Sequence, residues 1–174
     1  MNKTKALSYM LAVPEDPTDV ANGVLHLARL KNAKDFTVNG LEEKAGELQL
    51  TIGYLGKEYL VRMIPTEFKI PELYRIQHFF PDEDVEKLKK AHEGLGVILE
   101  FGEDPLEAYH LQLKIVHAAL PKKLAVFDDS AEKVLSGKWW RWQPRPRLLR
   151  HRAISTPLRQ SPMRVERCGF TATD

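Results

Sequence analysis

The sequence is poor in cysteine and has no long apolar run. Cys168 is the single cysteine among 174 residues, which excludes an intramolecular disulfide and a cysteine-based zinc site. The apolar stretch at 6–13 has only eight residues and ends at Pro14 without a cleavage pattern. It is too short for a membrane span and does not match a signal peptide. These absences predict a soluble, cytoplasmic protein.

Motifs of common enzymes are also missing. The sequence contains no nucleophile elbow, no Walker-type phosphate loop and no H-E-x-x-H zinc motif. Gly94 and Gly96 precede an apolar stretch instead of following one, which argues against a dinucleotide-binding loop. We therefore predict no catalytic, metal-binding or cofactor-binding residues and no cofactor, and an enzymatic activity is not indicated.

Two acidic motifs nevertheless contain residue types found in metal sites. Glu107 and His110 have the Glu-x-x-His spacing of di-iron helices, and His117 returns to the same side of the helix. A second such motif is absent, and Glu107 equally suits a capping box. Asp128 and Asp129 at the end of a strand have the chemistry of Mg²⁺ ligands, but two acids before a helix more often act as caps.

The apolar pattern of residues 1–138 predicts an α+β fold. The expected order is β-α-(β)-β-β-α-β-α-β, with about three helices packed in two layers on a mixed β-sheet. Strands are expected at 6–13, 36–38, 48–52, 59–63, 95–101 and 124–127, and helices at 16–32, at about 81–90 and at 105–120. A further helical turn is expected to follow Asp129.

The third helix is apolar on two sides. One stripe is formed by Leu106, Tyr109, Leu113, Val116 and Leu120. Leu111, Ile115 and Ala118 lie on the opposite side, and a helix that is apolar nearly all round is normally buried on both sides. We expect the first side to pack on the sheet. The second side is then a candidate interaction surface for a protein partner or for a missing C-terminal domain.

The composition changes abruptly at Lys138. All fifteen lysines lie at or before Lys138, and eight of the eleven arginines lie at or after Arg141. Residues 1–140 carry 18 basic and 22 acidic side chains, whereas 141–174 carry eight basic side chains against Glu166 and Asp174. We therefore predict a single domain at 1–138, followed by an arginine- and proline-rich tail at 139–174.

Three interpretations of this tail are open. The loss of lysine and the excess of arginine and proline are typical of an out-of-frame or truncated end. Alternatively, the tail binds nucleic acid or an anionic surface, because aromatic side chains alternate with cations. The candidate residues for that role are Trp139, Trp140, Arg141, Trp142, Arg145 and Arg147. The third interpretation is a disordered, solvated segment.

Two phrases of the sequence carry a resemblance to a known family. These are AVPEDPTDVANGVLHLARL and LEFGEDPLEAYHLQLKIVHAALPKKLAVFDDSAEKVLSGKW. Over roughly residues 5–139, the chain resembles the N-terminal part of an uncharacterised bacterial family, domain of unknown function 4026. The resemblance implies a longer protein that continues past Lys138 with further strands, and it assigns no functional residue.

The absence of a catalytic set and the doubly apolar third helix predict a non-catalytic protein-interaction module, or a fragment of one. An alternative is part of an enzyme whose active site is completed by a missing C-terminal half, with Asp128 and Asp129 at its edge. Binding of nucleic acid or an anionic surface through the basic tail is the third possibility.

Overall fold

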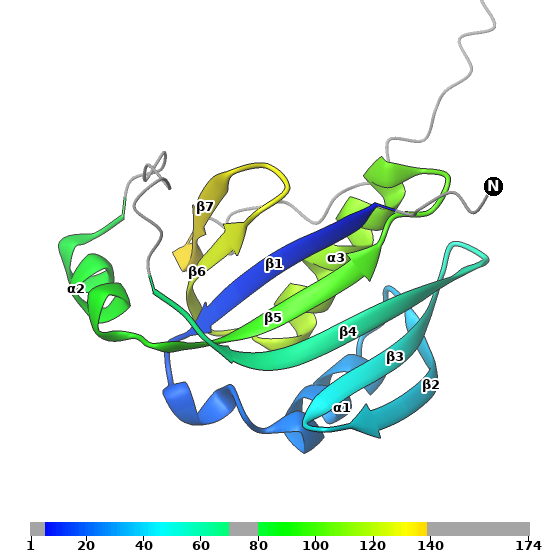
Figure 1. Ribbon diagram of the computed structural model, residues 1–174, viewed down its shortest axis with the longest axis horizontal. Helices are drawn as coiled ribbons and strands as arrows, with labels where there is room; N and C mark the ends of the chain where they lie inside the picture. The colour runs from blue at the N-terminus through cyan, green and yellow to red at the C-terminus, as the bar shows by residue number, and fades with distance from the viewer. Residues whose placement is uncertain (1–5, 70–79, 139–174) are drawn as a thin grey trace, which may run out of the picture. The chain divides into compact units, whose positions relative to one another are not determined.

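A seven-stranded antiparallel sheet forms the centre of the fold, with strand order β2-β3-β4-β5-β1-β6-β7 (Figure 1). The computed structural model describes residues 6–69 and 80–138. The sheet and its three helices confirm the predicted α+β class. The predicted mixed sheet is wrong, because β1 lies between β5 and β6 and is antiparallel to both. The division of the chain at Lys138 stays a prediction, since 139–174 lie outside the described residues.

The strands follow the apolar alternation of the sequence. They are β1 (Leu7–Pro14), β2 (Thr37–Lys44), β3 (Glu47–Tyr54), β4 (Lys57–Glu67), β5 (Glu93–Glu100), β6 (Lys123–Asp128) and β7 (Lys133–Ser136). The glycines of 53–58, between alternating runs at 48–52 and 59–63, predict a hairpin, which the pairing of β3 with β4 confirms. The expected helical turn after Asp129 is wrong, because that segment forms the turn into β7, which pairs with β6.

Helices α1 and α3 begin at polar caps, whereas α2 follows Pro81 without a capping side chain. A short 3-10 turn at Pro17–Asp19 is followed by a separate helix α1 (Gly23–Lys31), where the Asn22 side chain accepts a hydrogen bond from the Leu25 amide. Helix α2 spans Asp82–Lys90, and α3 spans Pro105–Ala119. The Asp104 carboxylate accepts hydrogen bonds from the first-turn amides of α3, as its sequence predicts.

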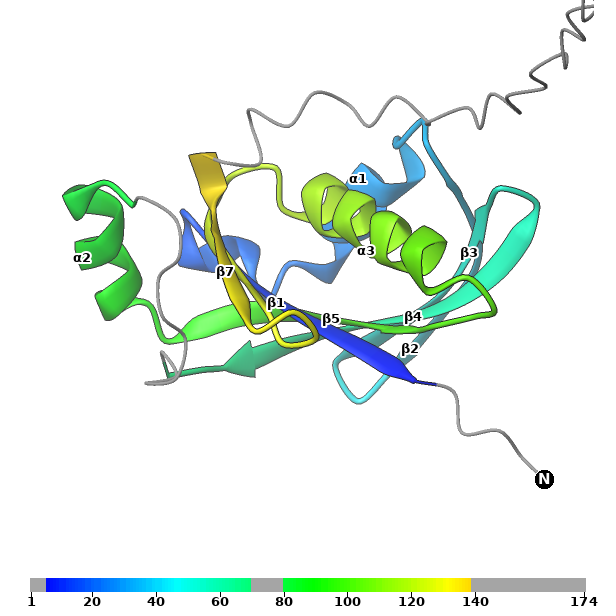
Figure 2. The ribbon, with the colours of Figure 1, turned by 90° about the horizontal axis from the view of Figure 1, so that it is seen from above.

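Helices α1 and α3 lie on the same face of the sheet, which we call the helix-covered face (Figure 2). Alternate strand residues such as Leu50, Ile52 and Val97 point into this core and are fully buried. On the opposite face, α2 packs through Leu88 over β1, β6 and β7. The sheet therefore separates two hydrophobic clusters, of which the one beneath α1 and α3 is larger.

Helix α3 packs on the sheet with the side that carries Leu111 and Ile115, which was expected to face a partner. Leu111 and Ile115 are fully buried in the core, whereas Leu106 is 64% exposed. The buried Gln112 amide between them donates to the backbone carbonyls of Ser8 and Val97, at 3.1 and 2.9 Å. This polar side chain at the centre of the contact orients the helix. Leu111 and Ile115 are therefore unavailable to a partner, which corrects that expectation.

Ala118, the third residue of that expected surface, is partly buried and packs against the same core. The adjacent C-terminus of α3 is held by two cations. The Arg29 guanidinium of α1 donates to the Ala119 carbonyl at 2.9 Å, and the Lys123 ammonium donates to the Leu120 carbonyl at 2.8 Å. Cations at this end satisfy carbonyls that lack helical partners and favour the helix dipole. The Arg29 contact ties α1 to α3 and so fixes α1 relative to the sheet.

Candidate functional site

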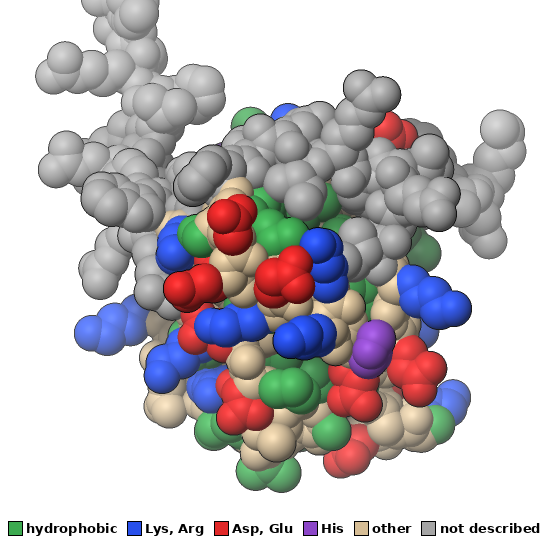
Figure 3. Space-filling view, turned by 90° about the vertical axis from the view of Figure 1, so that its left-hand side faces the viewer, with side chains coloured by type: hydrophobic (Ala, Val, Ile, Leu, Met, Phe, Trp, Pro, Cys, Tyr) green, Lys and Arg blue, Asp and Glu red, His purple; other side chains and the backbone are tan. Residues whose placement is uncertain are grey.

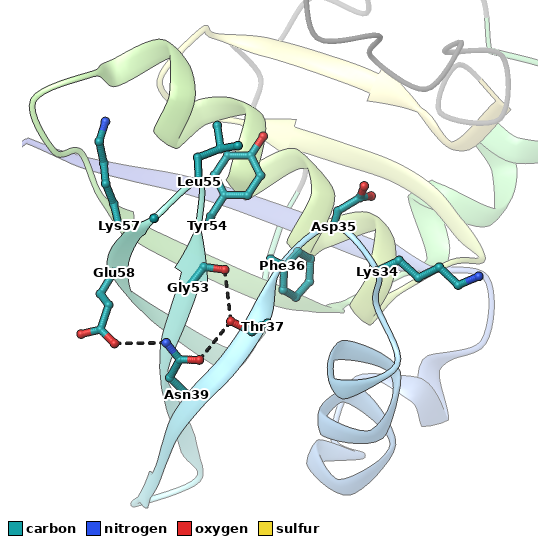
Figure 4. A pocket seen from close by; sticks show the side chains of 11 residues that line it. Lys34, Asp35, Phe36, Thr37, Asn39, Gly53, Tyr54, Leu55, Lys57 and Glu58 are labelled. Carbon is teal, nitrogen blue, oxygen red and sulfur yellow. Dashed lines mark hydrogen bonds between the residues drawn. The ribbon is translucent and has the colours of Figure 1, made fainter.

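Two hollows of similar size flank edge strand β2. The hairpin-end hollow, about 470 Å³, lies at the start of β2 (Figure 4) and is lined by Lys34, Asp35, Phe36, Thr37, Asn39 and residues 53–58. The second, which we call the α1–β2 groove, measures about 450 Å³ and is lined by Thr18, residues 21–24, Leu27, Leu41, Glu43 and Leu48. Strand β3 runs beneath both, with Leu48 in the groove and Tyr54 in the hairpin-end hollow.

Polar side chains in the hairpin-end hollow bind one another. The Thr37 hydroxyl donates to Asn39 Oδ1 at 3.0 Å, and Asn39 Nδ2 donates to Glu58 Oε1 at 3.1 Å (Figure 4). Asp35 forms an ion pair with Lys114 of α3 at 3.2 Å. The carboxylates that line this hollow therefore already have partners within the protein.

Glu107 of α3 binds two side chains of β4, of which Lys57 lines the hairpin-end hollow. The Tyr59 hydroxyl donates a hydrogen bond to the Glu107 carboxylate, and Lys57 Nζ lies 3.0 Å from the same oxygen. Burial, together with Glu107, raises the pKa of the Tyr59 hydroxyl, which therefore stays neutral and remains a donor. Glu107 thus links the third helix to β4, and the capping-box role suggested for it is not what the structure shows.

The Glu-x-x-His motif of α3 does not assemble a metal site. Glu107 binds Tyr59 and Lys57, while His110 is exposed. His117 Nδ1 lies 3.3 Å from Lys123 Nζ, and burial together with that cation lowers the pKa of His117. Within 6–69 and 80–138, no three His, Cys, Asp or Glu side chains are grouped to hold a metal ion.

Asp128 and Asp129 point to different sides of the sheet. Asp128 is fully buried beneath α3, where it accepts hydrogen bonds from the Tyr109 hydroxyl at 2.7 Å and from the Ala131 amide at 3.1 Å. Asp129 is exposed near Tyr9, whose pKa is raised by burial and by this carboxylate. Because Asp128 binds Tyr109 of α3 and Asp129 lies near Tyr9, the two acids do not converge on one ion.

Two of the acidic side chains of α2 form ion pairs with neighbouring lysines. Lys89 Nζ lies 2.8 Å from Glu86 Oε1, and Lys138 Nζ lies 3.7 Å from Asp84 Oδ2. Acidic and basic side chains are interspersed on the end of the molecule that carries α2 (Figure 3). This surface has the mixed charge of a solvated helix face and does not single out a basic partner.

The α1–β2 groove differs in being lined by exposed apolar side chains. Val24 is 83% exposed and Leu41 is 44% exposed, and both lie at its mouth. Leu48 is almost fully buried beneath them. Glu43 is the acidic side chain at the groove, and its neighbour Glu42 points to the opposite face of β2. Neither carboxylate has a hydrogen-bond or ion-pair partner among the described residues.

In the continuous helix expected at 16–32, the apolar pattern predicts one buried stripe formed by Val20, Val24, Leu27 and Ala28. The chain instead breaks between the 3-10 turn and α1, and the new start at Asn22 shifts the helical phase. His26 and Leu30 consequently point inward while Val24 points outward. The Asn22–Gly23 pair inside the expected helix was the available signal, because asparagine caps and glycine interrupts helices.

The structure gives no position for the residues expected to contact nucleic acid or an anionic surface. Trp139, Trp140, Arg141, Trp142, Arg145 and Arg147 all lie outside the described residues. Within the described ranges, no helix is long and apolar enough to cross a membrane.

Comparison with known proteins identifies the family and assigns no activity. No curated protein matches the chain, and no solved structure matches it. One family model matches residues 8–146, which covers all of the sheet except Leu7 and continues eight residues beyond Lys138. Its description is "Protein of unknown function (DUF4026) N-terminal". The chain therefore belongs to the DUF4026 N-terminal family.

Proposed function

We propose that this domain is a non-catalytic protein-interaction module that holds a partner protein in the α1–β2 groove. The observation that carries the proposal is the exposure of Val24 and Leu41 on either side of an apolar hollow of about 450 Å³. Apolar side chains gathered around a concave surface are a feature of binding sites, whereas single exposed ones are ordinary.

The position of the groove supports the same proposal. One wall is α1, which Arg29 anchors to α3, and the other is edge strand β2. Both walls are therefore parts of regular secondary structure that are fixed before a partner arrives. A preorganised site loses less conformational entropy on binding than a site built from loops.

Site-specific photo-crosslinking tests this function. A benzoylphenylalanine in place of Val24 is expected to capture one defined protein in cells, and the purified partner is then expected to bind the full chain. The same probe in place of Leu106 is the matched control, since Leu106 is a comparably exposed aliphatic residue on α3, outside the groove. A second substitution, Leu41→Arg, should abolish the capture at Val24. The same product from both probe positions, or none from Val24, contradicts the proposal.

A further inference from the structure

Strand β2 is an edge of the sheet as well as a wall of the groove. Among the described strands it pairs only with β3, and it is eight residues long, against four for the other edge strand, β7. An unpaired edge presents backbone N–H and C=O groups that another strand can bind. We infer that the partner adds an extended segment next to β2, and this inference rests on the proposed function. The added segment carries apolar and basic side chains at alternate positions.

The alternation follows from the two sides of β2. Leu41 and Glu43 lie on the helix-covered side and line the groove, whereas Gly40, Glu42 and Lys44 lie on the other side. A strand added next to β2 places every second side chain against the groove, because side chains alternate with period two. Those side chains meet Val24 and Leu41 and must be apolar to be buried there.

The basic positions follow from the charges of the strand. Lys44 stands opposite Glu47, whose pKa is lowered chiefly by its hydrogen bond with Arg62 and to a smaller extent by Lys44. Glu42 and Glu43 have no such partner among the described residues. Glu42 faces the side away from the groove, so a lysine or arginine at the alternate positions of the added strand can meet its carboxylate. Glu43, on the groove side, adds to the negative charge along this edge. A second copy of this chain would instead bring two further acids to the interface.

Two synthetic peptides test this chemistry on the full chain. The first is an eight-residue peptide of alternating arginine and valine, and the second replaces each arginine with glutamate. Exposed ion pairs contribute little individually, yet attraction in one peptide and repulsion in the other should together give about a tenfold difference in Kd. NMR amide shifts should be confined to 37–44 and to α1. Methylation of the peptide amides that face β2 should abolish binding.

Three variants of the protein test which residues are responsible for peptide binding and for the preference for arginine. Leu41→Arg should remove binding of the arginine peptide. The double substitution Glu42→Gln and Glu43→Gln should reduce the tenfold preference to about twofold or less, because it removes both acids without changing their size. Glu58→Gln is the matched control, since Glu58 lies at the hairpin-end hollow. The glutamine oxygen can still accept the hydrogen bond from Asn39.

The outcomes distinguish the proposed interaction function from the inference that a basic strand binds to β2. Equal binding of both peptides in the groove overturns the basic partner and leaves the interaction function standing. Binding by neither peptide, retained binding after amide methylation, or self-association of the full chain through β2 also overturns this inference. Failure of both the peptides and the Val24 crosslink overturns the proposed function as well.

Discussion

The two hollows beside β2 have nearly the same volume, about 470 and 450 Å³, but their side chains are in different states. In the hairpin-end hollow, Asp35 and Glu58 already have partners. In the α1–β2 groove, Val24 and Leu41 face solvent and Glu43 has no partner among the described residues. A hollow whose polar groups satisfy one another gains little from a ligand, because each new contact must replace an existing one. Volume alone does not distinguish these two regions.

This contrast implies that the two hollows contribute to different properties, one to stability and the other to partner binding. Side chains around the hairpin-end hollow should contribute to stability and leave partner binding unchanged. The exposed side chains around the groove should contribute to binding and little to stability. Measurements that fail to separate these two effects would remove the distinction between the hollows.

The largest change in the free energy of unfolding is expected for a substitution in the hydrophobic core. Ile115→Ala should reduce the free energy of unfolding by about 2 to 5 kcal/mol, because Ile115 is fully buried. Val24→Ala at the groove should change it by about 0.5 kcal/mol or less. Denaturant titration of both variants provides the measurement. Similar losses would show that Val24 is part of the core rather than of a binding surface.

The next effect concerns Glu107, which binds Lys57 beside the hairpin-end hollow. Glu107→Ala should cost about 1 to 3 kcal/mol, because it leaves the largely buried Tyr59 hydroxyl without its acceptor. Glu43→Ala in the groove should be nearly neutral for stability. Urea melts should show this difference, and binding of the arginine peptide should show the reverse order. A stable Glu107→Ala protein would contradict the account of that network.

The pH dependence of stability sharpens the description of α1. Burial lowers the pKa of His26, whose Nε2 has no hydrogen-bond partner. The unfolded chain therefore binds a proton more readily than the native protein. Stability should be complete above about pH 6.5 and decline below it, at up to about 1.4 kcal/mol per pH unit from this residue. Melts from pH 8 to pH 5 should show a weaker decline in His26→Leu, compared with the control His110→Gln. An unchanged slope would assign the decline to other groups.

The smallest effects are expected at the turns that end the two hollows. Ala45 and Leu55 have positive φ angles of 52° and 50°, and each is followed by a glycine in a two-residue turn. Asparagine tolerates this conformation better than alanine or leucine. Ala45→Asn and Leu55→Asn should each raise the free energy of unfolding by about 0.5 to 1 kcal/mol. A loss of stability at only one turn would show that its side chain makes a contact that matters for folding.

Local chemistry made several elements predictable from the sequence. The alternation of β3 and β4 around Leu55 and Gly56 identified their hairpin, and Asp104 before Pro105 identified the start of α3. In both cases the deciding residues are close together in the chain. Apolar alternation and helix capping act over a few residues and therefore leave a clear pattern.

The candidate site was not predictable in the same way. The groove exists because β2 lies at the sheet edge, and strand order depends on pairings between distant residues such as Met10 and Val97. The inward side of α3 was also ambiguous, because apolar residues occupy both sides of that helix. Gln112 decides the orientation through carbonyls of β1 and β5, which are remote in sequence.

The central place of β1 has a consequence for synthesis of the protein. The first strand of the chain pairs with β5 and β6, so its two neighbours end only at Glu100 and Asp128. Glu100 lies 86 residues and Asp128 lies 114 residues beyond the end of β1, so on the ribosome β1 waits for both neighbours, whereas β2, β3 and β4 can pair as soon as they are made. Until β5 emerges, the apolar residues Met10 to Val13 have no neighbouring strand, and until β6 emerges they have only one. Chaperones that bind short apolar segments should therefore engage this N-terminal strand in nascent chains and release it once β6 is available.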